Sequence, residues 1–475
     1  MSKYQYNSWE PVNIKAEDLT EKEKFLLRDS KTFCIYPWMH IHAYPTGEAY
    51  PCCRGEFEHP VANTNTQTLN EIINCDKMNS LRLDIINGIE RVECKKCYEQ
   101  DQHGFFSGRK SANKHYGHHI NKVKKDTLSD GSLAKFEMAH WDIRFSNLCN
   151  LSCRSCGHIF SSSWHKDQGR IVQDDYWNAV KGPDWPKNSP STTEDFNNLP
   201  ELVQKELRED LNSEIFEYLD YDKKVPVMTV AGGNEENMLQ QVLEHSEYVE
   251  QIYFAGGEPL IMEQHYRILN QLIDSGRSKD VLLQYNSNFM KLNYKGQHVF
   301  DLWKHFKHVS VGASLDAMGP HAEYIRTGTV WSTIEKNRID MIEQCPEVDF
   351  YISPTLSIMN AMHITDFHKD WVEKGLINPQ DLNINILQYP MHYRIDIAPN
   401  HYKEKIIKKY KEHIKWLEGH DDLQRATNGF ISAINFLDVN NTKYLNTFWE
   451  KTKQLDEIRN ENIFDFIPEL NEITT

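Results

Sequence analysis

The chain has 475 residues, of which 39% are hydrophobic and 26% charged, and its formal net charge is −16. This length predicts two or three structural units, and the composition excludes the disordered and membrane classes. The negative charge argues against binding of nucleic acid, and the lack of an apolar run of 18 residues or of an apolar N-terminal stretch predicts a cytoplasmic protein with no membrane partner.

Six of the ten cysteines lie in the first hundred residues. They are Cys34, Cys52, Cys53, Cys75, Cys94 and Cys97. Residues 40–44 and 48–50 are predicted to form a hairpin that ends at the adjacent Cys52 and Cys53, and Cys94 and Cys97 form a C-x2-C pair. Clustered cysteines in a long cytoplasmic chain indicate metal binding or catalysis. Four thiolates suit either a zinc ion or a fully ligated cubane, and their spacing alone leaves both open.

Short apolar runs alternate with amphipathic stretches from residue 137 to about 390, which is typical of strand–helix units with a parallel sheet. The six predicted strands cover residues 141–145, 251–255, 281–285, 309–314, 350–356 and 383–387. In the helix after the second strand, Tyr266, Leu269 and Ile273 fall on one face. Six such units predict an α/β fold, either a partial barrel or a doubly wound sheet, that binds ligands at the carboxyl ends of its strands.

Two regions fall outside this pattern. Residues 160–246 form a polar insertion with turn-rich stretches and a predicted helix from Pro200 to about Tyr221, which we interpret as a lid or side domain. Residues 401–417 and 442–459 are predicted to form helices that pack on the outside of the sheet.

Cys149, Cys153 and Cys156 follow the first strand of the α/β region at C-x3-C-x2-C spacing. Three thiolates on one short loop can hold three irons of a cubane, and the fourth iron is then open to a chelating ligand. The alternative is a zinc knuckle with His158 as a further ligand, although that histidine is poorly spaced for zinc.

Gly256-Gly257-Glu258-Pro259 follows the second strand of the same region. Its glycines let the backbone approach a ligand closely, and its carboxylate can accept a hydrogen bond from an ammonium group. By itself the motif could equally be a turn. Asn286, Ser314 and Arg326 follow later strands, and each alone could be a cap or turn residue.

Together, the cysteine triad and these later positions resemble the radical S-adenosylmethionine (SAM) superfamily, although Ser155 stands where that family usually has an aromatic residue. The resemblance implies a partial (β/α)6 TIM-like barrel with a SAM-binding [4Fe-4S] cluster on the triad. It also implies that Gly256, Gly257 and Glu258 bind the methionine amino group of SAM, and that Asn286, Ser314 and Arg326 contact its ribose and carboxylate. In this family the reduced cluster cleaves SAM to methionine and a 5′-deoxyadenosyl radical, which abstracts a hydrogen atom from the substrate.

The N-terminal cysteines resemble a twitch domain, the shortened form of the SPASM auxiliary-cluster domain. The resemblance rests on Cys34, on Gly47 with four residues between it and Cys52, and on the C-x2-C pair. It implies an auxiliary [4Fe-4S] cluster on Cys34, Cys52, Cys94 and Cys97, with Cys53 and Cys75 as alternatives to Cys52. The domain usually follows the barrel in the family, whereas here it precedes the triad.

The predicted division is an N-terminal extension at residues 1–29, a small cysteine-rich α+β twitch-like domain at 30–110, a barrel at 137–395 that contains the insertion at 160–246, and a helical extension at 400–475.

The leading functional hypothesis is a radical SAM enzyme that modifies a peptide or protein side chain. A dehydrogenase of a small polar substrate and a non-catalytic zinc scaffold are the alternatives. Expected partners are the peptide or small-molecule substrate and an electron donor such as flavodoxin or ferredoxin. The 22 histidines, including His118 and His119, are interpreted as scattered surface residues.

Overall fold

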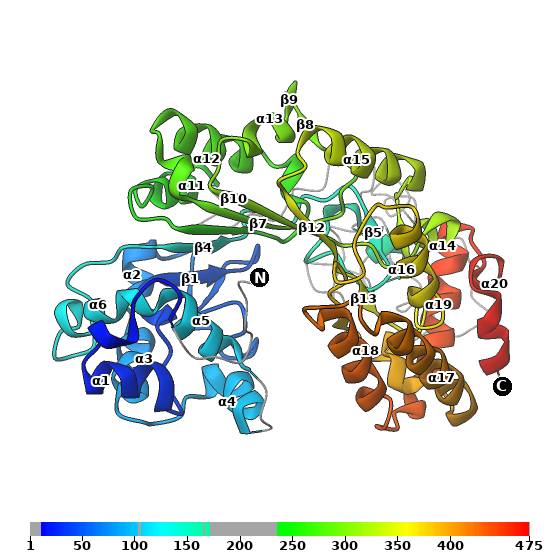
Figure 1. Ribbon diagram of the computed structural model, residues 1–475, viewed down its shortest axis with the longest axis horizontal. Coiled ribbons are helices and arrows are strands. Elements are labelled where there is room, and N and C mark those ends of the chain that lie inside the picture. The colour runs from blue at the N-terminus through cyan, green and yellow to red at the C-terminus, as the bar shows by residue number, and fades with distance from the viewer. Residues whose placement is uncertain (1–10, 103–105, 165–166, 172–234, 475) are drawn as a thin grey trace, which may run out of the picture. The chain divides into compact units, whose positions relative to one another are not determined.

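The computed structural model describes residues 11–102, 106–164, 167–171 and 235–474 (Figure 1). The chain divides into two compact units, of which the first comprises Met1–Ser146, Met228–Tyr285 and Tyr294–Ser310, and the second Asn147–Val227, Asn286–Asn293 and Val311–Thr475. The units cut across the predicted division into domains, which stays a prediction. Most of the predicted insertion at residues 160–246, including the predicted helix near residues 200–221, lies outside the described residues.

A large sheet with a parallel centre forms the core of the first unit. Its strands are β1 (His40–Ala43), β2 (Glu48–Tyr50), β3 (Ala62–Asn63), β4 (His140–Ile143), β6 (Gln251–Phe254), β7 (Leu282–Ser287) and β10 (His308–Ala313). They lie in the order β10-β7-β6-β4-β1-β2-β3, and β7 and β10 end in residues of the second unit. β1 is parallel to β4, β4 to β6 and β6 to β7, whereas β2 is antiparallel to β1 and β3.

The predicted N-terminal hairpin is confirmed as β1 and β2. Its turn requires glycine, because Gly47 has φ +101° and a Cβ there would lie 2.4 Å from Asn65 Nδ2. The hairpin does not stand apart from the α/β region, since β1 pairs with β4 in parallel register, His40 opposite His140 and His42 opposite Asp142. The cysteine-rich segment therefore extends the same sheet.

Helices of the first unit cover this sheet. They are α1 (Glu21–Lys24), α2 (Leu69–Ile73), α3 (Asp76–Ile86), α4 (Lys95–Gln102), α5 (Gly108–Tyr116), α6 (Ile120–Asp126), α11 (Glu235–Leu243), α12 (Glu263–Asp274) and α13 (Val299–Trp303). α12 is the predicted helix after the second strand, and Tyr266 and Leu269 are buried as expected. Its His265 packs edge-on against Phe254 and Tyr285, so α12 covers β6 and β7 (Figure 1).

The second unit combines short strands with helices. The strands are β5 (Ser152–Cys153), β11 (Arg326–Thr327), β12 (Asp349–Ile352), β13 (Thr355–Leu356) and β14 (Asn385–Ile386). The helices are α14 (Gly319–Ile325), α15 (Trp331–Gln344), α16 (Ile364–Glu373), α17 (Asn400–Leu417), α18 (Arg425–Phe436), α19 (Leu445–Arg459) and α20 (Ile463–Phe466). β5 pairs with β11 in antiparallel fashion, β13 with β14 in parallel, and β12 lies beside the end of β10.

Each of the six predicted strands overlaps a strand of the structure, so the α/β class with a large parallel sheet is confirmed. The fifth predicted strand is divided into β12 and β13, because Pro354 lies between them and has no N–H to donate. Closure into a partial barrel stays a prediction. Within the described ranges, the structure contains no helix that is both long and apolar enough to cross a membrane.

The interpretation of His118 and His119 as surface residues is wrong. Their side chains are 22% and 11% exposed, and both contact the carboxylate of Glu250. Glu250 lies more than 130 residues away in the sequence, so no local pattern indicates this contact.

Candidate iron–sulfur sites

The cysteine triad occupies one compact loop of the second unit. Cys153 lies in β5, and the backbone N–H of Cys156 donates to the Cys153 carbonyl at 3.0 Å, which closes a turn between them. Cys153 is buried, whereas Cys149 and Cys156 are half-buried. Burial raises the pKa of the Cys156 thiol to about 12, and the nearby sulfur of Cys153 contributes to this rise. These two sulfurs therefore lie close enough for their charges to interact.

Arg326 lies against the central cysteine of the triad. The β5–β11 register places Arg326 opposite Cys153, and Arg326 Nη1 donates to Cys153 Sγ at 3.5 Å. Two hydrogen bonds to the carboxylate of Asp316, at 2.8 and 3.0 Å, hold the guanidinium in place. Burial raises the pKa of the Cys153 thiol, whereas the Arg326 charge lowers it. Arg326 thus stabilises negative charge on a predicted cluster ligand.

Other predicted SAM contacts lie on neighbouring elements of the second unit. Asn288 Nδ2 donates to Asn150 Oδ1 at 2.9 Å, and Asn150 directly follows Cys149. The backbone N–H of Ser314 donates to the carbonyl of Ser287 at 2.7 Å. Asn286 and Ser314 are both half-buried. The sequence analysis singled out Asn286 and Ser314, whereas the contact to the cysteine loop comes from Asn288.

Arg154, between the second and third cysteines, anchors the loop to the C-terminal segment. Its fully buried guanidinium pairs with Asp456 and Glu461 and stacks 3.7 Å from the centre of the Tyr324 ring. Arg459 lies in α19, as Asp456 does, and its side chain donates a hydrogen bond to the carbonyl of Ser152 at 2.8 Å. The C-terminal helices were predicted to pack on the outside of the sheet, and α19 in addition contacts the triad loop.

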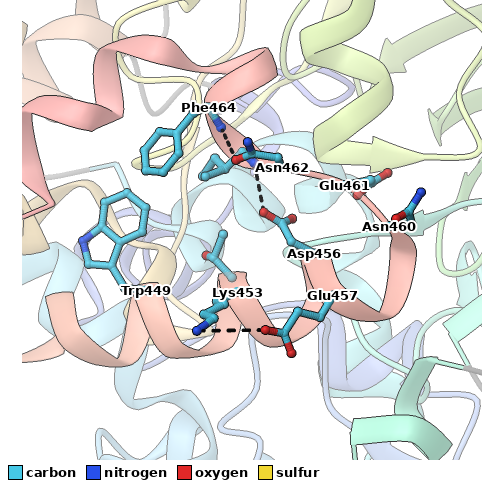
Figure 2. A pocket seen from close by; sticks show the side chains of 10 residues that line it. Trp449, Lys453, Asp456, Glu457, Asn460, Glu461, Asn462 and Phe464 are labelled. Carbon is cyan, nitrogen blue, oxygen red and sulfur yellow. Dashed lines mark hydrogen bonds and ion pairs between the residues drawn. The ribbon is translucent and has the colours of Figure 1, made fainter. Parts of the chain in front are cut away.

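A pocket of about 680 Å³ lies beside this anchor (Figure 2). Trp449, Thr452, Lys453, Asp456, Glu457, Asn460, Glu461, Asn462, Ile463 and Phe464 line it. Asp456 Oδ2 accepts a hydrogen bond from the backbone N–H of Ile463 at 2.9 Å. Two of the carboxylates that line the pocket are the partners of Arg154, so the pocket borders the structural anchor.

Four cysteines of the first unit, Cys34, Cys52, Cys94 and Cys97, interact electrostatically. Burial raises the pKa of the Cys34 thiol well above its usual range, and the sulfurs of Cys52, Cys94 and Cys97 raise it further. Burial and neighbouring thiols likewise raise the pKa values of Cys52 and Cys94 to about 12. Thiols that oppose one another's ionisation form a site at which bound metal can replace the protons. These four are the cysteines implied by the resemblance, and their role as cluster ligands stays a prediction.

Cys53 and Cys75, the alternatives to Cys52, interact with other groups. Cys53 is exposed, and its thiol interacts electrostatically with Asp142 and Arg144. Cys75 precedes α3, and its sulfur donates to the carbonyl of Val61 at 3.6 Å. The structure therefore favours Cys52 as the partner of Cys34.

The Gly-Gly-Glu-Pro segment of the first unit has the backbone that its glycines predict. Gly256 and Gly257 have φ of +84° and +54°. A Cβ on Gly256 would lie 2.6 Å from Arg144 Cδ, so that position requires glycine. Glu258 is buried, and its Oε1 accepts a hydrogen bond from the backbone N–H of Leu260 at 3.1 Å. The turn thus holds the carboxylate at the carboxyl end of β6.

Sequence reasoning missed a buried polar face on β1 and β4. His42 Nδ1 lies 2.9 Å from Asp142 Oδ2, and the rings of His40 and His140 stack with centroids 4.6 Å apart. Burial lowers the pKa of His40 to about 4 and that of His140 to about 3. The available signal was polar residues at alternate positions of both strands, in residues 40–44 and 140–144.

Comparisons with known proteins agree with the N-terminal cysteine site. Residues 34–98 match the SPASM family, described as an iron–sulfur cluster-binding domain. No curated protein matches the chain. The solved structure of native anSMEcpe with bound AdoMet and Cp18Cys peptide is 17% identical, with coverage of 36% of this chain and 48% of that chain and a TM-score of 0.26. A histidine-tagged form of anSMEcpe with bound AdoMet is 16% identical, with coverage of 41% and 55% and a TM-score of 0.29.

The chain spans about half the length of these solved chains. AdoMet is the same molecule as SAM. The segment that matches the SPASM family, residues 34–98, carries Cys34, Cys52, Cys94 and Cys97.

Proposed function

We propose that the chain is a radical SAM enzyme that abstracts a hydrogen atom from its substrate and thereby modifies a peptide or protein side chain. The observation that carries the proposal is that two separate cysteine sets occur in one chain. Four cysteines converge in a SPASM domain, and three more share one loop with Arg326 against the central sulfur. Auxiliary-cluster domains are associated with peptide and protein substrates in the family that these motifs resemble.

The residues of the triad loop fit a [4Fe-4S] cluster. Three cysteine thiolates suit three irons, and the Arg326 guanidinium offsets part of their negative charge in a buried setting. A cluster held by Cys149, Cys153 and Cys156 would supply one-electron reduction, the chemistry that reductive cleavage of SAM requires. Arg154 and Arg459 fix the loop by ion pairs and backbone hydrogen bonds, which keeps its three sulfurs at constant spacing.

Side chains of this chain would bind the amino acid part of SAM. Glu258 is a buried carboxylate at a strand end, and a charge-assisted hydrogen bond to an ammonium group is strong in such a setting. Positive φ at Gly256 and Gly257 exposes backbone groups without side chains in front of them. The segment therefore provides both a carboxylate and close backbone approach.

The SPASM cysteines offer four protein ligands, which leave no iron open to a substrate. Such a closed site suits electron transfer better than substrate binding. An electron donor such as flavodoxin or ferredoxin completes the proposal, because reductive cleavage of SAM needs one electron from outside the chain.

A second candidate is a dehydrogenase of a small polar substrate. The buried polar face with His42, Asp142 and Arg144 favours it, because Arg144 lies directly against Gly256 of the proposed SAM-binding segment. Reduced enzyme and SAM should change the mass of a peptide if the first candidate is right. Stimulation of SAM cleavage by polyols, with no peptide changed, would favour the second.

Anaerobic reconstitution followed by metal analysis tests the proposed class. We expect about eight irons and eight sulfides per chain, the content of two cubanes. On reduction with dithionite in the presence of SAM, chromatography should detect 5′-deoxyadenosine. Zinc without iron in the reconstituted protein would instead establish the zinc scaffold.

Replacing Arg326 by Gln should slow SAM cleavage while leaving the iron content unchanged. The variant loses the charge beside Cys153 and the ion pair with Asp316, and changes of this kind next to metal ligands cost about 10- to 100-fold in activity. The rate of 5′-deoxyadenosine formation and the iron content measure both effects. Arg277→Gln, in the first unit, is the matched control, and equal rates in the two variants would remove Arg326 from the site.

A further inference from the structure

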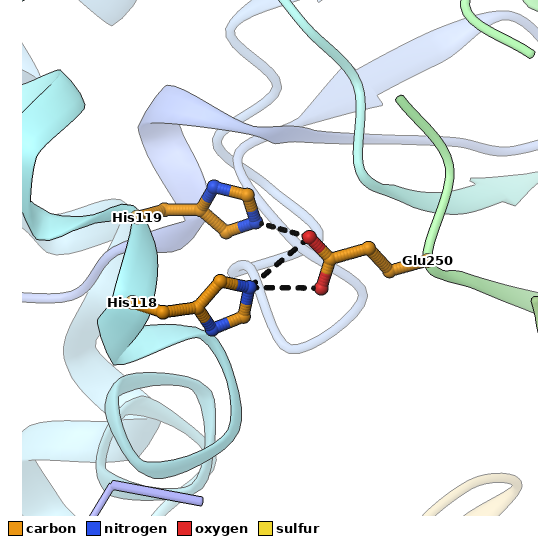
Figure 3. A group of neighbouring side chains, drawn as sticks. All are labelled: His118, His119 and Glu250. Atoms are coloured by element: carbon orange, nitrogen blue, oxygen red, sulfur yellow. Dashed lines mark hydrogen bonds and ion pairs between the residues drawn. The ribbon is translucent and has the colours of Figure 1, made fainter. Parts of the chain in front are cut away.

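His118, His119 and Glu250 form a compact group of side chains that includes no cysteine (Figure 3). His118 and His119 lie in the 3-10 helix Gly117–His119, and Glu250 directly precedes β6. Figure 3 shows both imidazole rings turned toward the one carboxylate. All three residues belong to the first unit.

The ligand atoms of the group converge within the span of one metal ion. His118 Nε2 lies 3.0 Å from each oxygen of Glu250, and His119 Nε2 lies 2.7 Å from Oε1. The atoms all lie within 4.8 Å of one another, and among the described residues this is the only such group of three or more. A tetrahedral zinc ion, with bonds of about 2.0 to 2.2 Å, separates its ligand atoms by about 3.4 Å. Small side-chain shifts would therefore admit the ion.

Hydrogen bonding does not account for the whole group. His119 Nε2 is 2.7 Å from the carboxylate, yet in the described structure its geometry satisfies no hydrogen bond. His118 Nδ1 is buried and also has no hydrogen-bond partner there. Two imidazoles directed at one carboxylate oxygen form a poor hydrogen-bonded pair, but their lone pairs can converge on a cation.

The backbone holds the proposed ligands rigidly. Glu250 donates its N–H to the carbonyl of Ala139 at 2.8 Å, and its own carbonyl accepts from Leu282 at 2.8 Å. Next to the histidines, the Tyr116 hydroxyl donates to the side chain of Gln251 at 2.7 Å. The hydrogen bond between Tyr116 and Gln251 therefore already connects the residue before the 3-10 helix to the start of β6. Ligands on such fixed elements need little ordering when a metal ion binds.

We propose that His118, His119 and Glu250 bind one divalent transition-metal ion, with zinc as the best match. Two imidazoles and one carboxylate are a common zinc donor set, in which water takes the fourth position. The group precedes β6, whereas the Gly256–Glu258 segment follows it, so the ion would lie at the amino end of the strand. Its role there is to fix the 3-10 helix to the sheet.

The test uses the full chain with both clusters reconstituted. The protein is treated with chelator, equilibrated with zinc chloride and desalted, and zinc and iron are then measured together by mass spectrometry. We expect about one zinc per chain, and a fall in zinc affinity of more than ~100-fold in Glu250→Gln and in His118→Ala, with unchanged iron. His305→Ala, which changes an exposed histidine, should keep the zinc.

Iron measured in the same samples separates this site from the cysteines. Zinc bound by cysteines would persist in Glu250→Gln, and that result would overturn the proposal. Failure of the wild type to retain zinc would also overturn it and would leave a hydrogen-bonded group only. As a second readout, zinc should raise the Tm of the wild type and leave that of Glu250→Gln unchanged, and equal shifts would count against the site.

Discussion

Replacing Cys153 by Ala should reduce 5′-deoxyadenosine formation to the level seen without enzyme. Cys153 is the buried, central sulfur of the triad and the one that accepts from Arg326, so two remaining sulfurs would have to hold the cluster. We also expect iron to fall from about eight to about four per chain, since one cubane is lost. Chromatography of reduced samples and iron analysis measure the two effects.

Cys345→Ala provides the matched control for this variant. Cys345 is a buried cysteine of the same unit that lies outside both cysteine sets, and its substitution should keep full iron content and full SAM cleavage. Persistent 5′-deoxyadenosine formation in Cys153→Ala would refute the assignment of the triad. The comparison also separates cluster loss from general damage by a cysteine substitution.

Replacing Cys94 by Ala should remove the other cluster and spare SAM cleavage. Cys94 acts electrostatically on Cys34 and Cys52, and it is one of the four cysteines that converge in the SPASM domain. We expect iron to fall to about four per chain, while cleavage of SAM uncoupled from substrate remains measurable. Turnover of substrate should be lost, because the proposed electron route needs both clusters.

Cys53→Ala and Cys75→Ala are the controls, and both should keep about eight irons. Cys53 lies beside Asp142 and Arg144, and Cys75 donates to Val61. Unchanged iron in Cys94→Ala would remove Cys94 from the ligand set. If Cys53→Ala instead lost four irons, that result would identify Cys53, and not Cys52, as the cluster ligand.

Local patterns predicted most of the strands and both cysteine sets. Alternation and apolar runs place the six strands of the α/β region, and turn residues place the N-terminal hairpin, because these signals act over a few residues. The spacing of Gly47 before Cys52 selects Cys52 from the adjacent pair, and its role as a ligand stays a prediction. The break between β12 and β13 also has a local signal, because Pro354 lacks the N–H that a strand residue donates.

Contacts between distant segments could not be predicted in this way. The parallel pairing of β1 with β4 joins residues about a hundred positions apart, and neither strand carries a local signal for its neighbour. The ion pairs of Arg154 with Asp456 and Glu461 cross some three hundred residues. The contact of His118 and His119 with Glu250 likewise forms only in the folded chain, so the sequence around the histidines does not predict it.

The pairing of β1 with β4 bears on the unusual order of the cysteine sets. A SPASM domain that shares a sheet with the strand before the triad is tied to it by main-chain hydrogen bonds. This pairing fixes the position of β1 beside β4 within the first unit.

The central claim is that the Cys149, Cys153 and Cys156 loop leaves one iron free to chelate the amino acid part of SAM. Paramagnetic resonance of the anaerobically reduced protein, mixed with SAM labelled with ¹⁵N at the methionine amino group, tests this claim most directly. Magnetic coupling between the label and a reduced cluster is the predicted result, present in Cys94→Ala and absent in Cys153→Ala. A wild-type spectrum with no coupling to the label would contradict the account.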